Sequence, residues 1–600
     1  MSVERPTVPP APRPPMAWAS DAFAELLGRL RLRHIALNPG ASYRGLHDSL
    51  VNYLGNEDPR ILVCLHEEHA VSIAHGYAKV AEEPMAVALH SNVGLMHATM
   101  ALYNAWCDRV PMLVIGATGP LDAAARRPWI DWIHTASDQA ALIRPYIKWD
   151  DQPLSVTAGV EALVRADALT RAYPCAPVYV CLDAALQESE LDAPVAMPAL
   201  ERHRPPPPPA AGAAELDAAA EILATAERPL ILAGRVSRST AAWDERVELA
   251  ERLEAAVLTD LKAGAAFPTA HRLHPAAPAT FLSAEGTELL RACDALVALD
   301  WIDLGGTLRQ AFGDAPPPPR IISASSDFVL HNGWSKDHFA LAPADVALTA
   351  HPDAVVSGLL ERLREREPAR ERTDWPPPPR IDREAPPVHE EITVSSLAAA
   401  LRDALGERDS CLVRAPLGWS GGDWACAHPL DYLGQDGGAG LASGPGMLVG
   451  AALALEGSGR MAVAVLGDGD TLMGATALWS AARYRIPLLA IVANNRTYLN
   501  DEIHQERVAR ARSRPIENRW VGQQLRDPDP DLAALGRSLG LRGIGPVERA
   551  ADLAAALAEA IAAVEAGEAV IVDVRVLAGD YPGASTSGEN ASQTATRKAR

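Results

Sequence analysis

Short apolar runs recur along the chain, each followed by small or polar residues and then by a stretch rich in Ala, Leu and Glu. The runs do not alternate apolar and polar positions, which indicates strands that are buried on both faces. Examples are HIALNPG (34–40), RPLILAGR (228–235) and MAVAVLGDGD (461–470). Strands of this kind, alternating with helical stretches, predict an α/β fold built on parallel sheets.

Proline-rich segments divide the chain into three blocks. Segments 201–214 and 365–387 are rich in proline and charge and cannot form regular elements, so we interpret them as linkers. The arm 1–16 and the tail 581–600 are predicted to be disordered. We therefore predict three α/β domains, each with a central parallel sheet flanked by helices, over residues 17–200, 215–364 and 388–580.

Charge and cysteine content narrow the classes of partner. The 600 residues carry a formal net charge of −21, which argues against nucleic acid or an anionic membrane as the main partner. The seven cysteines form no CxxC pair, the N-terminus has no apolar signal-peptide core, and no apolar stretch is long enough to span a membrane. We expect a cytoplasmic protein that acts on a small molecule.

Two apolar runs in the last block end in chemically informative residues. Gly467-Asp468-Gly469 follows the first run and Asn494-Asn495 follows the second, with 24 residues between Gly469 and Asn494. Ligands of open parallel sheets bind beyond the carboxyl ends of the strands, where both groups should lie. Asp468 and Asn495 offer the hard oxygen atoms that Mg²⁺ shares with phosphates. GDG alone is most often a plain turn, whereas the paired pattern is specific.

This paired pattern resembles the cofactor signature of thiamine diphosphate enzymes. The resemblance implies that Asp468, Asn495 and the backbone carbonyl of Thr497 hold Mg²⁺, which clamps the cofactor diphosphate. It also implies diphosphate contacts at Gly467 and Gly469, and a bent cofactor supported by Leu441. Two residues depart from the family pattern: Asp470 stands where a small residue is usual, and Arg496 stands where glycine is usual. An extra acid beside a phosphate is repulsive unless a cation compensates it.

A second motif belongs to the same family resemblance. In HEEHAVSIAHGYAKV (66–80), Glu67 lies nine residues before the glycine of Gly-Tyr-Ala, as the family's activating glutamate does. That glutamate binds the aminopyrimidine ring of the cofactor, so Glu67 is the main catalytic candidate. Glu68 is interpreted as an ordinary first-turn helix residue. In the family this glutamate meets the metal site across a subunit interface, which implies a homodimer or homotetramer.

Further candidates rest on matching positions in relatives. A histidine titrates near neutral pH and suits proton transfer, although any single histidine is most often a surface or core residue. The loop RRPWIDWIHTASDQ (126–139) falls where relatives face the substrate. The helix YLNDEIHQE (498–506) is polar here, which fits either a polar substrate or a solvated helix. The proton-transfer candidates are His90, His271 and His274, and the substrate-pocket candidates are Ala41, Ser42, Trp132, His134, Asp501 and His504.

The resemblance covers most of the chain and is closest to the acetolactate synthase and benzoylformate decarboxylase branch. It implies cleavage or formation of a C–C bond next to a carbonyl. The main expectation is decarboxylation of a 2-oxo acid, with protonation or carboligation of the resulting enamine, and cleavage of a C–C bond without loss of CO₂ is also open. Three alternatives remain open: an FAD-containing relative, a non-catalytic regulatory paralogue that binds the cofactor weakly, and a plain NAD-binding protein. The last has little support, because no strand-GxGxxG-helix unit with a following acid occurs.

Overall fold

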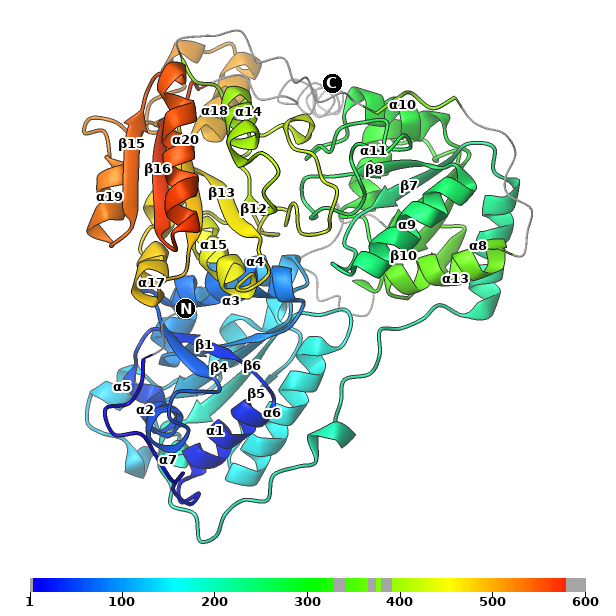
Figure 1. Ribbon diagram of the computed structural model, residues 1–600. Helices are drawn as coiled ribbons and strands as arrows, with labels where there is room; N and C mark the ends of the chain where they lie inside the picture. The colour runs from blue at the N-terminus through cyan, green and yellow to red at the C-terminus, as the bar shows by residue number, and fades with distance from the viewer. Residues whose placement is uncertain (1–3, 328–340, 365–373, 379–390, 579–600) are drawn as a thin grey trace.

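Three α/β domains make up the protein. The computed structural model describes residues 4–327, 341–364, 374–378 and 391–578 (Figure 1). Each domain contains one sheet in which all paired strands run parallel. The predicted fold class is therefore confirmed. The C-terminal tail 581–600 and most of the linker 365–387 lie outside the described residues.

The N-terminal domain has a six-stranded sheet of order β2-β1-β3-β4-β6-β5. Its strands are β1 (His34–Leu37), β2 (Arg60–Val63), β3 (Met85–Leu89), β4 (Met112–Thr118), β5 (Asp150–Asp151) and β6 (Pro177–Asp183). Its helices are α1 (Ala19–Arg29), α2 (Arg44–Asp48), α3 (Glu67–Ala81), α4 (Ser91–Cys107), α5 (Ile130–Ile133), α6 (Val156–Arg171) and α7 (Ala184–Gln187).

The middle domain has a five-stranded sheet of order β11-β10-β9-β7-β8. Its strands are β7 (Pro229–Ala233), β8 (Ala256–Thr259), β9 (Ala295–Leu299), β10 (Arg320–Ala324) and β11 (Val346–Leu348). Its helices are α8 (Ala213–Thr225), α9 (Thr240–Leu253), α10 (Ala284–Ala292), α11 (Leu304–Phe312) and α13 (Pro352–Arg364).

The C-terminal domain has a five-stranded sheet of order β12-β13-β14-β16-β15. Its strands are β12 (Ser410–Arg414), β13 (Met461–Gly467), β14 (Leu488–Asn494), β15 (Arg542–Val547) and β16 (Ala569–Arg575). Its helices are α14 (Val394–Leu405), α15 (Ser443–Ala454), α16 (Asp468–Gly474), α17 (Ala477–Tyr484), α18 (Leu499–Ala511), α19 (Leu532–Ser538) and α20 (Ala550–Glu565).

Helices α3 and α15 join the N-terminal and C-terminal domains. They lie between the two sheets (Figure 1), and one apolar core runs through both domains at this level. A Cβ atom added at Gly76 would collide with the carbonyl of Met447, and one at Gly450 with the carbonyl of Ile73. The two glycines therefore permit a close helix crossing, which holds the two domains of one chain in a fixed relation.

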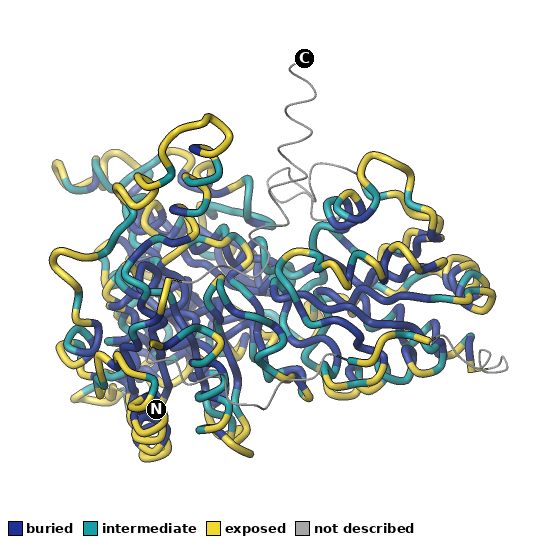
Figure 2. The backbone as a smooth tube through the Cα atoms, turned by 90° about the horizontal axis from the view of Figure 1, so that it is seen from above, coloured by how far each residue is buried: buried dark blue, intermediate teal, exposed yellow. Residues whose placement is uncertain are grey.

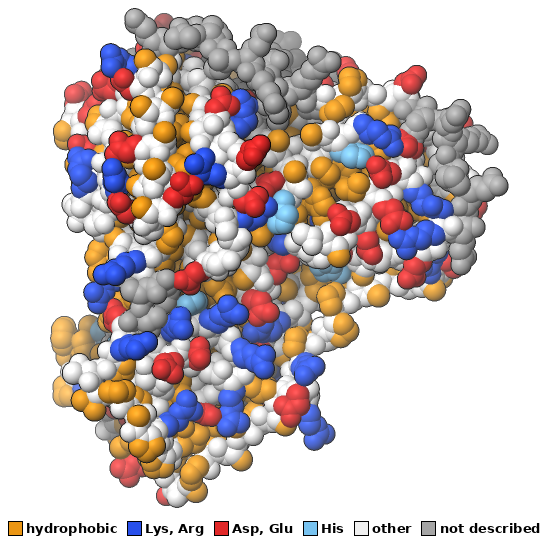
Figure 3. Space-filling view, viewed as in Figure 1, with side chains coloured by type: hydrophobic (Ala, Val, Ile, Leu, Met, Phe, Trp, Pro, Cys, Tyr) orange, Lys and Arg blue, Asp and Glu red, His pale blue; other side chains and the backbone are white. Residues whose placement is uncertain are grey.

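Burial follows the apolar runs of the sequence. The central strands of all three sheets lie inside, and most exposed positions fall on outer helices, loops and edge strands such as β15 (Figure 2). On the face shown in Figure 3, acidic and basic side chains are interspersed, so this face presents no extended surface of one charge. Within the described residues, no helix combines the length and apolar character that a bilayer span requires.

Residues 4–16 of the proline-rich arm follow a defined path over the protein surface. The Asn56 side chain donates a hydrogen bond to the Glu4 carbonyl at 2.8 Å, and the Glu4 carboxylate pairs with Arg483 at 2.6 Å. Arg13 pairs with Glu25 at 2.8 Å. Polar side chains of both linked domains thus contact this arm.

Candidate active site

The carboxyl ends of β13 and β14 form one wall of a large cavity. Gly467 pairs with Ala493 in the sheet, so the residues that follow each strand lie side by side. The cavity has a volume of about 660 Å³. Its lining comes entirely from the C-terminal domain. It includes most of the candidates from this part of the sequence: Leu441, Gly467, Asp468, Gly469, Asp470, Asn495, Thr497 and Asp501.

Asp468 has one carboxylate oxygen without a protein partner. Its Oδ1 accepts a hydrogen bond from the Gly469 amide at 2.9 Å, whereas its buried Oδ2 accepts none from the described residues. Burial raises the pKa of Asp468. Asn495 Oδ1 accepts from the Thr497 amide at 3.0 Å and lines the same cavity. An orphaned carboxylate oxygen beside an amide oxygen is a donor set that fits a hard divalent cation.

Asp470 supports the loop that precedes α15. Its Oδ1 accepts hydrogen bonds from the amides of Ala442 and Gly444, at 2.8 and 3.4 Å. Burial raises the pKa of Asp470, and the nearby Arg414 guanidinium opposes this rise. Arg414 also pairs with the buried Asp436 at 3.1 Å. The acid that departs from the family pattern thus binds backbone amides, and the charge of the nearby Arg414 opposes its own.

Arg496 occupies a backbone conformation that favours glycine. Its φ is +60°, in the left-handed region, which explains why a glycine is usual there. Its guanidinium pairs with Asp529 at 3.3 Å, and neither residue lines the cavity. This departure from the family pattern therefore places no side chain at the cation site.

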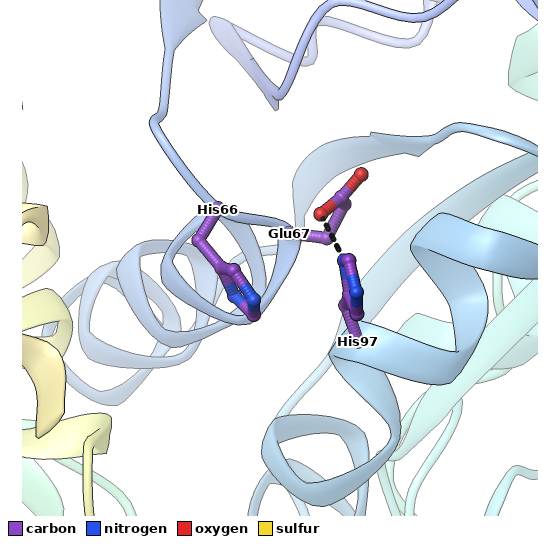
Figure 4. A group of neighbouring side chains, drawn as sticks. All are labelled: His66, Glu67 and His97. Atoms are coloured by element: carbon purple, nitrogen blue, oxygen red, sulfur yellow. Dashed lines mark hydrogen bonds and ion pairs between the residues drawn. The ribbon is translucent and has the colours of Figure 1, made fainter.

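Glu67 opens helix α3 at the carboxyl edge of the N-terminal sheet. It is only 6% exposed, and its Oε2 accepts a hydrogen bond from His97 Nδ1 at 3.0 Å (Figure 4). The His66 ring stacks on the His97 ring, with 4.7 Å between centroids. The sequence patterns did not identify His66 or His97. Both lie beside motif positions, but nothing in their spacing shows that they meet Glu67.

His90 directly follows β3, and its hydrogen bonds define its tautomer. The Ser42 amide donates to His90 Nδ1 at 3.4 Å, and Ser42 Oγ, which accepts from the Ser91 amide at 3.1 Å, lies 2.9 Å from the same nitrogen. Nδ1 is then the acceptor, and Nε2 carries the ring proton. The His134 ring packs edge-on against His90 at 4.7 Å. Burial and then the charge of His134 lower the pKa of His90, which favours the neutral ring.

Of the remaining candidates, Ala41 lies beside the group around His90, whereas the middle-domain histidines lie apart from it. Ala41 adjoins Ser42 and is exposed, and Trp132 is 73% exposed. His274 is fully buried in the middle domain, where its Nε2 bonds Thr259 Oγ1 at 2.9 Å and burial lowers its pKa to about 4. His271 pairs with Glu251 at 3.2 Å. These two histidines and the exposed His504 do not line the cavity that contains Asp468.

Two groups of candidates therefore exist in one chain. One group, around Glu67 and His90, lies on the N-terminal sheet, and the other, around Asp468, lies on the C-terminal sheet. No residue before Thr393 lines the cavity of the second group. Within one chain, the residues of each group lie close to one another, but the two groups do not line a common cavity.

Comparison with known sequences identifies all three domains. Residues 17–142 match "Thiamine pyrophosphate enzyme, N-terminal TPP binding domain". Residues 216–333 match the central domain of these enzymes, and residues 418–574 match their C-terminal TPP binding domain. The three matches follow the order of the three sheets and together cover more than half of the chain.

Full-length relatives share this organisation. The chain is 26% identical to a benzoylformate decarboxylase of Pseudomonas aeruginosa, over 91% of this chain and 97% of the relative. It is 27% identical to a probable 2-ketoarginine decarboxylase of the same organism, over 87% and 88%. The structure of the 4-hydroxybenzoylformate decarboxylase of Rhodococcus jostii matches with a TM-score of 0.76 at 25% identity, covering 94% of this chain and 100% of the other.

Proposed function

The chain belongs to the thiamine pyrophosphate enzymes, and on this basis we propose that it decarboxylates a 2-oxo acid and that it requires Mg²⁺. Its cofactor is thiamine diphosphate, and its relatives include decarboxylases and acetolactate synthases. Bound thiamine diphosphate supplies the electron sink that accepts the bonding electrons when CO₂ leaves. The protein residues bind, orient and transfer protons.

The observation that carries the proposal is the unpartnered Asp468 Oδ2 on the cavity wall. Asp468, Asn495 and the carbonyl of Thr497 would hold Mg²⁺, because buried carboxylate and amide oxygens are suitable ligands. The backbone at Gly467 and Gly469 would approach the diphosphate, and Leu441 would support the cofactor from the cavity wall. The Asp470 charge is directed to backbone amides, which supports a functional diphosphate site.

The N-terminal group would supply the proton chemistry. Glu67 would present to the cofactor its Oε1, the carboxylate oxygen that has no partner within the described residues. His90 carries its ring proton on Nε2, because Ser42 occupies Nδ1. His90 is therefore a proton donor for the product carbon, with His134 beside it in the substrate pocket. Delivery of this proton gives an aldehyde, and attack on a second carbonyl instead gives a ligation product.

A second copy of the chain would complete the active site. The two groups lie on separate sheets, and several large apolar side chains beside them are exposed, with Met96 at 58%. Exposed apolar surface around a half-site supports burial against a partner. We propose a homodimer or homotetramer in which Glu67 of one subunit faces Asp468 of another. All seven cysteines are unpaired, which supports a cytoplasmic location.

The cavity wall favours a substrate with a polar side chain. Asn500 and Asp501, at the start of α18, line the cavity where a purely aromatic substrate would need apolar contacts. Relatives include decarboxylases named for benzoylformate and for 2-ketoarginine. Of these two compounds, we propose that the cationic 2-ketoarginine is the better substrate, because Asp501 is a carboxylate.

The FAD alternative receives little support from the middle domain. The cavity at the carboxyl edge of its sheet measures about 160 Å³, whereas small-molecule sites usually span about 300–1,000 Å³. Arg235, which follows β7 in this cavity, pairs with Asp300 and Asp327 at 3.3 and 2.7 Å. Ion pairs therefore occupy the edge where a dinucleotide would bind.

The proposal is tested by calorimetric titration of thiamine diphosphate with Mg²⁺ into wild type and Glu67→Gln. The release of CO₂ from benzoylformate, 2-ketoarginine and pyruvate is then measured for both proteins. Both proteins should bind the cofactor. Turnover should fall by about 10²–10⁴-fold in Glu67→Gln, the usual effect of removing an acid–base group. Absence of binding to wild type would instead establish the non-catalytic regulatory alternative.

A further inference from the structure

Glu67 is held in an asymmetric way. Its Oε2 accepts a hydrogen bond from His97 Nδ1 at 3.0 Å, whereas Oε1 has no hydrogen-bond partner within the described residues. In Figure 4 the second oxygen points away from both imidazole rings. Oε1 is not among the fully buried side-chain atoms that lack a partner, so a ligand can reach this oxygen. The hydrogen bond from His97 thus fixes Oε2 and leaves Oε1 available to a ligand.

The His97 ring is itself restrained. An ionised carboxylate only accepts hydrogen bonds, so Nδ1 of His97 must carry the ring proton. The His66 ring covers one face of His97, at 4.7 Å and an interplanar angle of 23°. His66 is restrained in turn, because its Nδ1 accepts the Glu68 amide proton at 3.2 Å as the cap of α3. The donor to Glu67 therefore has a fixed orientation.

Helix α4 supplies both the donor and the space for Glu67. Gly94 and His97 are three residues apart on α4 and so lie on the same helix face. A Cβ atom at Gly94 would lie 3.0 Å from Glu67 Oε1, tighter than ordinary van der Waals contact. Glycine at this position thus leaves Oε1 accessible, while His97 binds Oε2.

We propose that His97 is a positioning residue that orients the Glu67 carboxylate toward the cofactor ring. This inference rests on the proposed function, because it assumes that Glu67 binds the aminopyrimidine ring. His97 donates from Nδ1 and does not itself exchange a proton with the cofactor. Its side chain is 49% exposed in a single chain, on the side where the proposed partner subunit would bring the cofactor.

The test compares two substitutions of His97 in the full-length protein. Asn places its amide nitrogen close to the position of histidine Nδ1, so His97→Asn keeps the donor, whereas His97→Leu removes it. His203→Leu is the control, because His203 is an exposed residue outside both groups. Cofactor binding is measured by calorimetry with Mg²⁺. Activation is measured by deuterium exchange at the reactive carbon of the bound cofactor, read by NMR after acid quench.

His97→Leu should bind the cofactor within about threefold of wild type, because His97 touches Glu67 and not the cofactor. Its exchange rate should fall about 10–100-fold, the cost of a misplaced catalytic group. His97→Asn should retain most of the wild-type rate. In a Glu67→Gln background, His97→Leu should cause little further loss, because the two residues act through one contact.

Three results would overturn the inference: wild-type exchange in His97→Leu, equal loss in His97→Asn and His97→Leu, or full additivity with Glu67→Gln. Equal loss in the two variants would show that the imidazole itself transfers a proton. These results differ from failure of the proposed function, which would appear as absence of cofactor binding in wild type and would remove the inference with it.

Discussion

The N-terminal and C-terminal domains use one sheet topology for two kinds of chemistry. Apart from the edge strand β2, the N-terminal sheet has the strand order β1-β3-β4-β6-β5. The C-terminal sheet has the same connectivity, with the order β12-β13-β14-β16-β15. In each sheet the second of these strands leads directly into a helix, at His90-Ser91 after β3 and at Asp468 after β13. One edge carries imidazoles around Glu67, and the other carries the carboxylate and amide oxygens of Asp468 and Asn495.

The difference shows what the scaffold contributes. A parallel sheet supplies a rigid edge with open backbone groups, and the residues just beyond the strands decide whether this edge binds a cation or moves a proton. His90 stays neutral because it is buried beside His134. In Asp468, Oδ1 accepts from the Gly469 amide, whereas the buried Oδ2 accepts from none of the described residues. Substitutions at His90 and Asp468 test this division of labour, and those at Asp470 and His69 test the support around it.

The largest effect is expected at His90. His90→Leu removes the Nε2 proton donor and should lower turnover by about 10²–10⁴-fold, without changing the affinity for thiamine diphosphate. Ser42→Ala is the matched variant, because it keeps the ring but loses the hydroxyl that fixes its tautomer, and it should show a smaller loss. The measurements are steady-state CO₂ release and calorimetry. A loss of cofactor affinity in His90→Leu would contradict the division between the two edges.

Asp468→Asn should show the opposite pattern. Loss of the carboxylate charge should weaken Mg²⁺-dependent cofactor binding by at least about 10–100-fold, the range measured for weaker perturbations around metal sites. The rate at saturating cofactor should fall much less. Calorimetry with and without Mg²⁺ measures the effect, and Asp501→Asn is a control on the same cavity. Unchanged affinity would contradict the assignment of the cation site to β13.

Asp470 should contribute mainly to stability. Asp470→Ala leaves the amides of Ala442 and Gly444 without an acceptor, which should lower the free energy of unfolding by about 1–3 kcal/mol. Asp470→Asn keeps an oxygen acceptor and should lose less. Urea unfolding compares the two variants with wild type. Tighter cofactor binding in Asp470→Asn would show instead that the carboxylate repels the diphosphate.

The smallest effect is expected at His69, where the two compared domains meet. His69 Nε2 bonds Thr476 Oγ1 at 2.7 Å, and burial lowers the pKa of His69 to about 4. Between its unfolded pKa of about 6.5 and this value, only the unfolded chain binds the proton. This contribution to stability is therefore complete above pH ~6.5 and is lost as pH falls toward ~4.

His69→Gln should reduce this pH dependence, since the amide keeps a bond to Thr476 but does not titrate. The urea midpoint of the variant should change less than that of wild type between pH 7 and pH 4.5. His34 and His274 are also buried and have lowered pKa values, but both are present in wild type and variant. The difference in pH dependence between the two proteins therefore comes from His69. Equal slopes would show that His69 is protonated in the folded state.

Local patterns in the sequence are enough to specify the fold class and the cofactor. Unbroken apolar runs specify parallel strands, and polar residues at their ends specify what the sheet edge binds. Glu67, Asp468 and Asn495 are predicted from such patterns, and the order of the matching fragments along the chain indicates the family. These features are local in sequence, because a strand and the residues that follow it are set by neighbouring positions.

The support around these residues comes from tertiary packing. His97 meets Glu67 across 30 positions, and Asp470 meets the amide of Ala442 across 28. Packing also makes Arg414 the buried cation near Asp470, and it keeps the groups around Glu67 and Asp468 apart in one chain. Spacing along a sequence does not encode such contacts, because they depend on how helices pack and where each side chain points.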